Sequence, residues 1–339
     1  MKIKMGVVGL RFGRYMIEEI QAQPANNFFE IAAVCDLDAF KAEEMAKKLG
    51  VAAYYSLDSL LENKDVAVIA LFTGPAGRAE LIRKIIRAGK DVMTTKPFES
   101  NAANALEVLR EAKGLGRVVH LNSPSPLPSE DLSIIFNWIE KYKLGRPIAC
   151  RSDVWINYKE REQPSGDWQD DPELCPAAPI YRLGIYAISD LIRILGEPEC
   201  VSVMQSRIFT GRPTSDNAQL SIKFKNNSIA NIFASFCIND GHYYKNSMIL
   251  NYDNGTIYKN VGPSKKGEPY KLEVVANDGE ILDSATFSEH SGIYQWENFY
   301  KAVRGEKLPG EISPEEITVG VRIVEAMKKA QKTGGTVFC

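Results

Sequence analysis

Two glycines near the start of the chain mark a turn that could hold a phosphate. In Gly9-Leu10-Arg11-Phe12-Gly13 they sit where an apolar run gives way to a helical pattern. A dinucleotide site needs glycine there, because the turn must tighten and the N–H groups that open the helix must reach the pyrophosphate. Arg11 stands where the second glycine of G-x-G-x-x-G belongs, and it either crowds the phosphates or pairs with them. The alternative is an ordinary strand-to-helix turn.

A carboxylate ends the second apolar run. Asp36 follows Cys35 directly, at the expected carboxyl end of a strand. A carboxylate in this place accepts hydrogen bonds from adenosine ribose hydroxyls and repels a 2′-phosphate, which favours NAD over NADP. The alternative is a helix-capping aspartate without a ligand.

A lysine follows the fourth apolar run, in Thr94-Thr95-Lys96-Pro97-Phe98. Ligands bind outside the carboxyl ends of parallel strands. A lysine there can donate to a substrate hydroxyl or carbonyl oxygen, and burial can lower its pKa toward a working range. The alternative is a surface loop lysine beside a turn proline.

A cation and a phenol share one face of a later predicted helix. Arg182 and Tyr186 are four residues apart in Tyr181-Arg182-Leu183-Gly184-Ile185-Tyr186. A cation beside a phenol lowers the pKa of the phenol, which would let Tyr186 accept or donate a proton. Alternatively, Tyr186 packs between helix and sheet while Arg182 pairs with an acidic residue of 170–173.

Alternating strands and helices must position the first two clusters. The predicted strands cover 4–9, 29–35, 66–72, 91–94 and 118–121, and the predicted helices cover 12–23, 38–50, 79–88 and 101–112. This order predicts a Rossmann-type doubly wound parallel sheet with helices on both faces. We expect residues 1–122 to form a dinucleotide-binding domain.

The pattern changes after about residue 145, where a strand over 147–158 and a helix over 179–195 precede a series of hairpin signals. Asn226-Asn227, Asn254-Gly255 and Asp278-Gly279 supply the turns, and two helices close the chain, the second starting near Pro314. We expect residues 123–339 to form a domain for substrate binding and oligomerisation. Its predicted fold is an open, mostly antiparallel sheet with helices on one face.

Composition excludes several classes of protein. The 339 residues are 45% hydrophobic and 25% charged, with a formal net charge of −2. This mixture is that of an ordinary globular protein, and it lacks the basic footprint of a nucleic-acid binder and the long apolar runs of a membrane protein. Six cysteines without a CxxC pair and three scattered histidines (120, 242 and 290) predict no metal site and no disulfide frame. The first apolar run is too short for an export signal, so we expect a cytoplasmic location.

The order of these features resembles the glucose–fructose oxidoreductase / inositol dehydrogenase / MocA family. The resemblance rests on the glycine turn, Cys35-Asp36, Lys96-Pro97 and Gly184-x-Tyr186, followed by the antiparallel sheet, and it covers nearly the whole chain. It implies NAD as the cofactor, with NADP as the alternative, and a sugar, cyclitol or related polyol as the substrate. It also implies that Lys96 positions and helps to deprotonate the substrate hydroxyl, that the Lys96–Pro97 peptide is cis, and that Tyr186 replaces the family's usual histidine. Members commonly associate through the outer face of the second sheet, so we expect a homo-oligomer.

Several positions depart from the family pattern. Thr95 replaces a glutamate, Arg182 replaces an acidic residue, Cys175-Pro176-Ala177-Ala178 replaces a glycine run, and Pro124-Ser125-Pro126 replaces an Arg-Phe pair. A guanidinium in place of a carboxylate inverts the local charge, which predicts an anionic substrate such as a uronate or sugar acid. The same changes are compatible with a loss of hydride transfer.

The sequence therefore predicts an NAD(P)-dependent oxidoreductase that moves a hydride between a nicotinamide and a hydroxyl carbon of a sugar, sugar acid or cyclitol. The alternatives are an NAD-dependent glycosidase on the same scaffold and a non-catalytic, nucleotide-responsive binding protein. The predicted catalytic residues are Lys96, Tyr186 and Arg182. The predicted cofactor contacts are Gly9, Arg11, Phe12, Gly13, Asp36, Thr73, Lys96 and Pro97.

Overall fold

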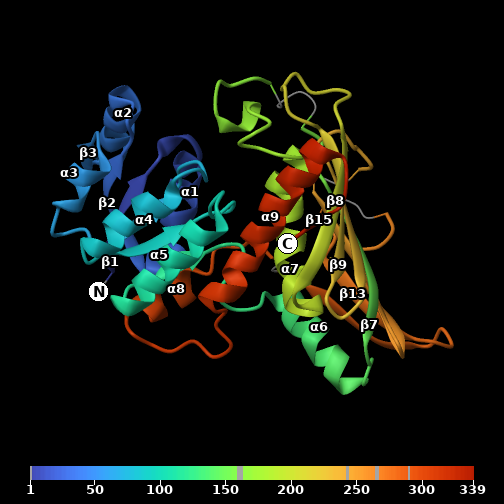
Figure 1. The fold of residues 1–339 in the computed structure, drawn as a ribbon. Coiled ribbons are helices and arrows are strands. Elements are labelled where there is room, and N and C mark those ends of the chain that lie inside the picture. The colour runs from blue at the N-terminus through green and yellow to red at the C-terminus, as the bar shows by residue number, and fades with distance from the viewer. Residues whose placement is uncertain (1, 159–162, 242–243, 264–266, 289–290) are drawn as a thin grey trace. The chain divides into compact units, whose positions relative to one another are not determined.

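The computed structural model describes residues 2–158, 163–241, 244–263, 267–288 and 291–339. The chain forms two compact units (Figure 1). Unit 1 comprises Met1–Leu127 and Tyr294–Glu315, and unit 2 comprises Pro128–Ile293 and Glu316–Cys339. The predicted division into residues 1–122 and 123–339 differs from this one, because the segment 294–315 belongs with unit 1.

The sheet of unit 1 has six parallel strands in the order β3-β2-β1-β4-β5-β6. This is the order of a doubly wound dinucleotide-binding fold, as predicted. The strands are β1 (Ile3–Val8), β2 (Phe29–Cys35), β3 (Ala52–Tyr54), β4 (Val68–Leu71), β5 (Asp91–Thr94) and β6 (Val119–Leu121). β4 and β5 are buried along their whole length, which explains their continuous apolar sequences.

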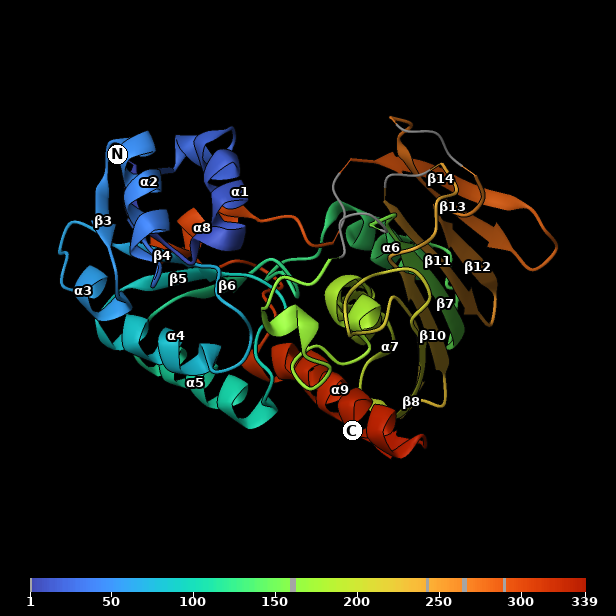
Figure 2. The same cartoon turned by 90° about the horizontal axis from the view of Figure 1, so that it is seen from above.

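Helices lie on both faces of this sheet (Figure 2). They are α1 (Leu10–Gln21), α2 (Ala39–Leu49), α3 (Leu57–Leu61), α4 (Arg78–Arg87), α5 (Ala102–Gly114) and α8 (Trp296–Val303). The predicted ends of α2 are confirmed: Asp38 accepts a hydrogen bond from the N–H of Lys41, and Gly50 takes a left-handed conformation after the last turn.

Aromatic packing explains why α8 belongs to unit 1. Phe299 stacks on Phe29 of β2 with ring centroids 5.4 Å apart, and Trp296 meets the same ring edge-on at 5.9 Å. The indole N–H of Trp296 also donates to Glu19 of α1 at 2.7 Å. The core on this face of the sheet is therefore completed by a segment that lies far along the chain.

The sheet of unit 2 has nine strands in the order β14-β13-β12-β11-β7-β10-β9-β8-β15. They are β7 (Pro147–Trp155), β8 (Pro198–Ser206), β9 (Asn217–Phe224), β10 (Ile229–Ser235), β11 (Lys245–Tyr252), β12 (Gly255–Lys259), β13 (Tyr270–Ala276), β14 (Ile281–Phe287) and β15 (Val337–Phe338). β10 and β7 pair in parallel and the other neighbours pair antiparallel, so the sheet is mostly antiparallel, as predicted.

The helices of unit 2 pack on one face of this sheet (Figures 1 and 2). They are α6 (Glu130–Lys141), α7 (Ile185–Leu195), which follows the π-helical turn η3 (Ile180–Gly184), and α9 (Pro314–Thr333). β9 alternates buried and more exposed residues, and its buried side chains join those of α7 and α9 in one core. In the described part of the chain, no helix is long and apolar enough to cross a membrane.

Candidate functional site

The glycine turn lies at the carboxyl edge of the parallel sheet, directly after β1. Gly9 has a φ of 86°, and a Cβ at this position would lie 2.8 Å from the carbonyl oxygen of Phe72. One turn into α1, a Cβ on Gly13 would lie 3.3 Å from Val7 and 3.4 Å from Phe72. Both glycines therefore let the backbone of α1 approach the ends of β1 and β4 closely.

The N-terminus of α1 is open to an anion. Its N-cap residue, Gly9, has no side chain to cap the helix, and the first turn contains no acidic residue. The free N–H groups and the helix dipole make such an end electropositive. Arg11 is exposed on this turn, and the exposed Phe12 packs edge-on against Phe72 with centroids 5.8 Å apart. The side chain of Arg11 is thus not packed inside the turn.

Asp36 links the end of β2 to this turn. Its Oδ2 accepts the N–H of Leu10 at 2.7 Å, and its Oδ1 accepts the N–H of Asp38 at 3.0 Å. A carboxylate oxygen has a second lone pair, so both atoms can still accept hydrogen bonds from ligand hydroxyls. The capping role and the ribose-binding role considered for Asp36 are therefore compatible.

The loops after β4 and β5 are joined by one buried cation, Arg78. Its guanidinium donates to the carbonyl oxygens of Thr73, Thr95 and Pro97, and its side chain is 1% exposed. The sequence analysis missed this residue. Its position in the sequence could have indicated a structural role, because an arginine at the start of a helix opposes the helix dipole and needs a specific partner.

Thr73 and Lys96 lie on the two loops that Arg78 joins. The Thr73 hydroxyl is buried and has no hydrogen-bond partner among the described residues. Lys96 is half-buried, its N–H donates to Asn122 Oδ1 at 3.0 Å, and the Lys96–Pro97 peptide is cis. The replaced motif position, Thr95, is buried. The loop that carries Lys96 is thus fixed to neighbouring segments on both sides.

Arg182 stacks on an aromatic ring in unit 2. Its guanidinium carbon lies 4.6 Å from the centroid of Phe236, a cation–π distance. Two of the acidic residues that the sequence offered as partners bind other cations: Asp170 pairs with Arg212, and Glu173 pairs with Lys332 at 2.7 Å. The π-helical turn that holds Arg182 leads directly into α7.

Tyr186 occupies the first turn of α7 and is half-buried. Its ring lies against the backbone of Gly292, where a Cβ would be 2.3 Å from the ring Cε1. Gly292 has a φ of 102°, so both its conformation and this contact require glycine. Sequence reasoning did not single out Gly292, because nothing local links it to Tyr186.

The structure brings the predicted cofactor residues to one edge of one sheet. These residues follow the ends of β1, β2, β4 and β5 or open α1: Gly9, Arg11, Phe12, Gly13, Asp36, Thr73, Lys96 and Pro97. Arg182 and Tyr186 belong to unit 2. All six cysteines are free, and no three His, Cys, Asp or Glu side chains in the described ranges group as metal ligands. His120 is buried, which lowers its pKa to about 3, whereas His242 and His290 lie outside the described residues.

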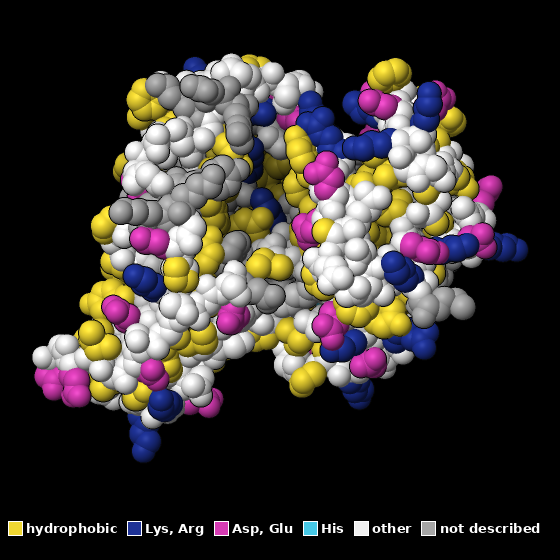
Figure 3. All heavy atoms as spheres, turned by 180° about the vertical axis from the view of Figure 1, so that it is seen from behind, with side chains coloured by type: hydrophobic (Ala, Val, Ile, Leu, Met, Phe, Trp, Pro, Cys, Tyr) yellow, Lys and Arg dark blue, Asp and Glu magenta, His cyan; other side chains and the backbone are white. Residues whose placement is uncertain are grey.

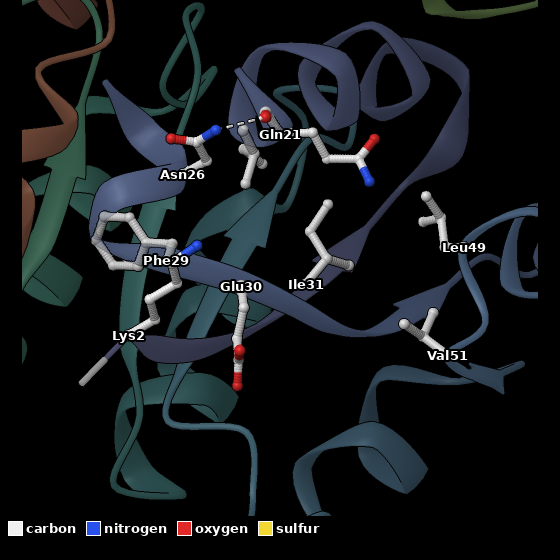
Figure 4. Close-up of a pocket in the computed structure, with 9 residues that line it drawn as sticks. Lys2, Gln21, Asn26, Phe29, Glu30, Ile31, Leu49 and Val51 are labelled. Carbon is white, nitrogen blue, oxygen red and sulfur yellow. Dashed lines mark hydrogen bonds between the residues drawn. The ribbon is translucent and has the colours of Figure 1, made fainter. Parts of the chain in front are cut away.

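A separate pocket of about 330 Å³ lies at the opposite end of the strands of unit 1 (Figure 4). Its lining comes from the end of α1, the start of β2 and the end of α2. Asn26, in the turn between α1 and β2, donates to the carbonyl of Gln21 at 2.9 Å. Lys2 and Glu30 are its charged residues. Parallel sheets bind their ligands at the carboxyl edge, so this pocket is not part of the candidate site.

Comparison with known proteins gives two family matches in succession. Residues 3–123 match the oxidoreductase family with an NAD-binding Rossmann fold, and residues 135–258 match the GFO/IDH/MocA C-terminal domain. Together the two matches cover well over half of the chain. The first match assigns the glycine turn and Asp36 to an NAD-binding fold.

Individual relatives and one solved structure agree with this result. Dehydrogenase aclE of Aspergillus oryzae is 32% identical over 61% of this chain and 59% of its own length. Galactose 1-dehydrogenase of Pseudomonas fluorescens is 25% identical over 82% of this chain and 84% of its own length. The WlbA dehydrogenase of Bordetella pertussis, solved with NADH and UDP-GlcNAcA, superposes with a TM-score of 0.74 at 14% identity and covers 100% of this chain and 99% of its own.

The first curated relatives, two oxidoreductases of Schizosaccharomyces pombe, are matched over only about half of their length. The first of the two consecutive domain matches lies within unit 1 and the second within unit 2. The chain therefore belongs to the GFO/IDH/MocA oxidoreductase family.

Proposed function

We propose that this protein is an NAD(P)-dependent oxidoreductase that transfers a hydride between a nicotinamide and a hydroxyl carbon of a sugar, sugar acid or cyclitol. The observation that carries the proposal is the carboxyl edge of unit 1. There, a helix N-terminus that begins with Gly9, where the backbone leaves no room for a Cβ, lies beside Asp36 at the end of the neighbouring strand. This combination suits a diphosphate joined to a ribose.

The residues at this edge fit a dinucleotide. The N–H groups of Arg11 and Phe12 would meet the pyrophosphate, and Asp36 would accept the ribose hydroxyls, which favours NAD over NADP. The buried Thr73 hydroxyl has an unused hydrogen-bonding capacity on the adjacent loop. Bound NAD supplies the hydride acceptor for oxidation of the substrate.

The chain's own residues would handle the substrate and its proton. Lys96, on the loop fixed by Arg78, would donate to the substrate oxygen and orient the reacting carbon. Tyr186 would accept the hydroxyl proton during oxidation and return it during reduction. Arg182 would recognise a negative group on the substrate, since its stacking on Phe236 fixes a cation at the start of the same helix.

The substrate class rests on chemistry and on relatives. Galactose 1-dehydrogenase is named for a sugar, and WlbA was solved with a nucleotide sugar acid. A cation in place of the family's acidic residue supports an anionic substrate for this chain. We therefore propose uronates and sugar acids as the first substrates to examine.

A stepwise assay tests the proposal. Calorimetry with NAD and NADP comes first, followed by an absorbance screen for reduced nicotinamide against sugars, uronates and cyclitols. We expect NAD to bind and one of the acids to be oxidised. Release of a free sugar without net reduced cofactor would indicate the glycosidase. Binding of NAD without turnover across the panel would indicate a non-catalytic binding protein, and no heat with either dinucleotide would refute the assignment.

We further propose that the protein forms a homo-oligomer through the open face of the sheet of unit 2. The helices of this unit pack on the other face (Figure 2), and the open face carries the half-buried Phe233, Ile249 and Tyr258. Light scattering coupled to size exclusion tests this: we expect more than one copy in the wild type, and a smaller mass when Phe233 is replaced by Glu.

The surface charge supports a small-molecule partner and no nucleic acid. On the face shown in Figure 3, acidic and basic side chains are interspersed with hydrophobic ones. A nucleic-acid partner requires a continuous basic surface. A cytoplasmic location is part of the same proposal, and the six free thiols support a reducing compartment.

A further inference from the structure

A ring of buried polar side chains lies within unit 2. Its charged members are Asp131 of α6, Asp190 of α7 and Lys259 at the end of β12, which are 0%, 2% and 1% exposed. The Lys259 Nζ lies 2.5 Å from Asp131 Oδ2 and 3.9 Å from Asp190 Oδ2. Two helices and one strand thus meet at a single ammonium group.

Two serines close the ring on its other side. The Ser129 hydroxyl donates to Asp131 and lies 3.2 Å from the Ser291 hydroxyl, which donates to Asp190 Oδ1 at 2.5 Å. The five residues Ser129, Asp131, Asp190, Lys259 and Ser291 are therefore neighbours around one closed loop, called the buried ring below.

The buried ring contains one ammonium group and two carboxyl groups with different pKa values. The ammonium group of Lys259 lies closer to Asp131, and it lowers the pKa of that carboxyl group. Burial raises the pKa of Asp190 to about 7, against the opposing effect of Lys259. Buried ionic groups of this kind contribute less stability than well-packed apolar side chains would.

Two members of the buried ring, Asp190 and Ser291, are connected to Tyr186 through the chain. Asp190 lies one turn after Tyr186 on α7, so the two side chains share a helix face. Ser291 precedes Gly292, whose backbone packs against the Tyr186 ring. Tyr244, whose hydroxyl is buried, has a pKa that burial raises and that Tyr186 and Asp190 raise further, which places its phenol within electrostatic range of both.

We infer that the buried ring is a positioning device for the phenol of Tyr186. The Ser291–Asp190 hydrogen bond fixes residues 291 and 292 against α7, and Gly292 then fixes the plane of the Tyr186 ring. Asp190 and Ser291 are positioning residues, since neither is placed against the substrate. This inference rests on the proposed function, in which the phenol of Tyr186 transfers the substrate proton.

The first test does not depend on turnover. Tyrosine labelled with a carbon isotope at the hydroxyl-bearing ring carbon gives one signal per tyrosine, and Tyr186→Phe identifies the signal of Tyr186. We expect Ser291→Ala to shift or broaden it. Ser152→Ala, which removes another buried serine hydrogen bond in unit 2, made to Ser247 at 3.1 Å, is the matched control and should leave it unchanged. An unchanged Tyr186 signal in folded Ser291→Ala would overturn the inference.

Two variants of Asp190 keep the inference testable if Ser291→Ala does not fold. Asp190→Asn retains a carbonyl acceptor for Ser291, so the Tyr186 signal should stay in place. Asp190→Ala removes the acceptor, so the signal should move as in Ser291→Ala. If Asn and Ala displace the signal equally, or if neither displaces it, the hydrogen bond does not position the phenol and the inference fails.

The second test uses kinetics on whichever substrate the screen identifies. Ser291→Ala should lower kcat by about ten-fold or more with little change in KM, because a misplaced catalytic group slows the chemical step. In a Tyr186→Phe background the same change should cost nothing further. Equal losses in both backgrounds would show a general structural role and overturn the inference. If the wild-type protein shows no turnover, the proposed function is contradicted. The labelled-tyrosine test then still decides whether the buried ring positions the phenol of Tyr186.

Discussion

Gly9 combines a backbone conformation and a contact that other residues do not allow. We predict that Gly9→Ala lowers the free energy of unfolding by about 1–3 kcal/mol and weakens NAD binding by at least about ten-fold. The strain comes from the positive φ, and the lost affinity comes from the 2.8 Å approach of a Cβ to the Phe72 carbonyl, which must displace the turn.

Gly50→Ala is the matched control for Gly9→Ala. Gly50 has a φ of 69°, but a Cβ there meets nothing within 4 Å. This variant should show the strain without any change in NAD affinity. Denaturant unfolding and calorimetry measure the two effects separately. Equal NAD affinity in both variants would contradict the assignment of the glycine turn.

Asp36 should decide the choice between the two dinucleotides. We predict that Asp36→Asn raises the affinity for NADP relative to NAD by about ten-fold or more, because the amide removes the negative charge that repels a 2′-phosphate. The amide oxygen can still accept the N–H of Leu10, so the melting temperature should change little. Asp38→Asn, at the N-cap of α2, is the control and should leave the ratio unchanged. Calorimetry with NAD and with NADP measures this affinity ratio for each variant.

Among single residues, the sequence indicated those that follow a recognisable strand, and it did not indicate those whose partners lie far away along the chain. Asp36 and Lys96 were singled out because each follows an apolar run, and the structure places them after β2 and β5; their roles remain predictions. Arg78 escaped because its acceptors lie on two other loops, and Asp190 escaped because Lys259 comes from a distant strand. No spacing rule along the chain can predict such contacts.

At the scale of elements, Arg78 lets the first turn of α4 hold the loops after β4 and β5. We predict that Arg78→Met lowers the free energy of unfolding by about 3 kcal/mol or more, because it leaves two buried carbonyl oxygens and one partly buried one without their donor. It should also weaken NAD binding, because the loops that carry Thr73 and Lys96 lose their link.

Arg83→Met on the same helix provides the comparison for Arg78→Met. Arg83 forms ion pairs with Glu80 and Glu111 nearer the surface, and exposed pairs of this kind contribute about 0–1 kcal/mol. Denaturant unfolding and NAD titration of the two variants distinguish them. If Arg83→Met were as damaging as Arg78→Met, the link between the loops would not be the cause.

Long elements with clear ends were predictable, and short or remote ones were not. α2 was predicted to within one residue of each end, because Asp38 and Gly50 supply a cap and a stop. β3, with three residues, and α3, with five, are too short to show a period. α6 was missed although Leu132, Ile135 and Trp138 have helical spacing and are buried. α8 was expected, but its place in unit 1 depends on packing against Phe29 that no local pattern records.

At the scale of the whole molecule, two buried groups give the two units opposite responses to pH. In unit 2, burial raises the pKa of Asp190 from 3.8 to about 7, so its contribution is complete below pH 3.8 and is lost as pH rises through 7. Lys259, Asp131 and Arg193 are the charges that act on it. In unit 1, burial lowers the pKa of His120 from 6.5 to about 3, so its contribution is complete above pH 6.5 and is lost as pH falls through 3.

We therefore predict that acidification from pH 7 to pH 5 destabilises unit 1 while Asp190 stabilises unit 2. Each group changes the free energy of unfolding by up to about 1.4 kcal/mol per pH unit, because that is the cost of one proton taken up by one state alone. Trp296 is the single tryptophan of unit 1 among the four in the chain, so fluorotryptophan signals can follow the two units separately during denaturant unfolding. Asp190→Asn should abolish the acid stabilisation of unit 2 and leave unit 1 unchanged, and His120→Phe should do the reverse. Parallel pH responses of both units in the wild type would contradict this account, since it requires each group to titrate within its own core.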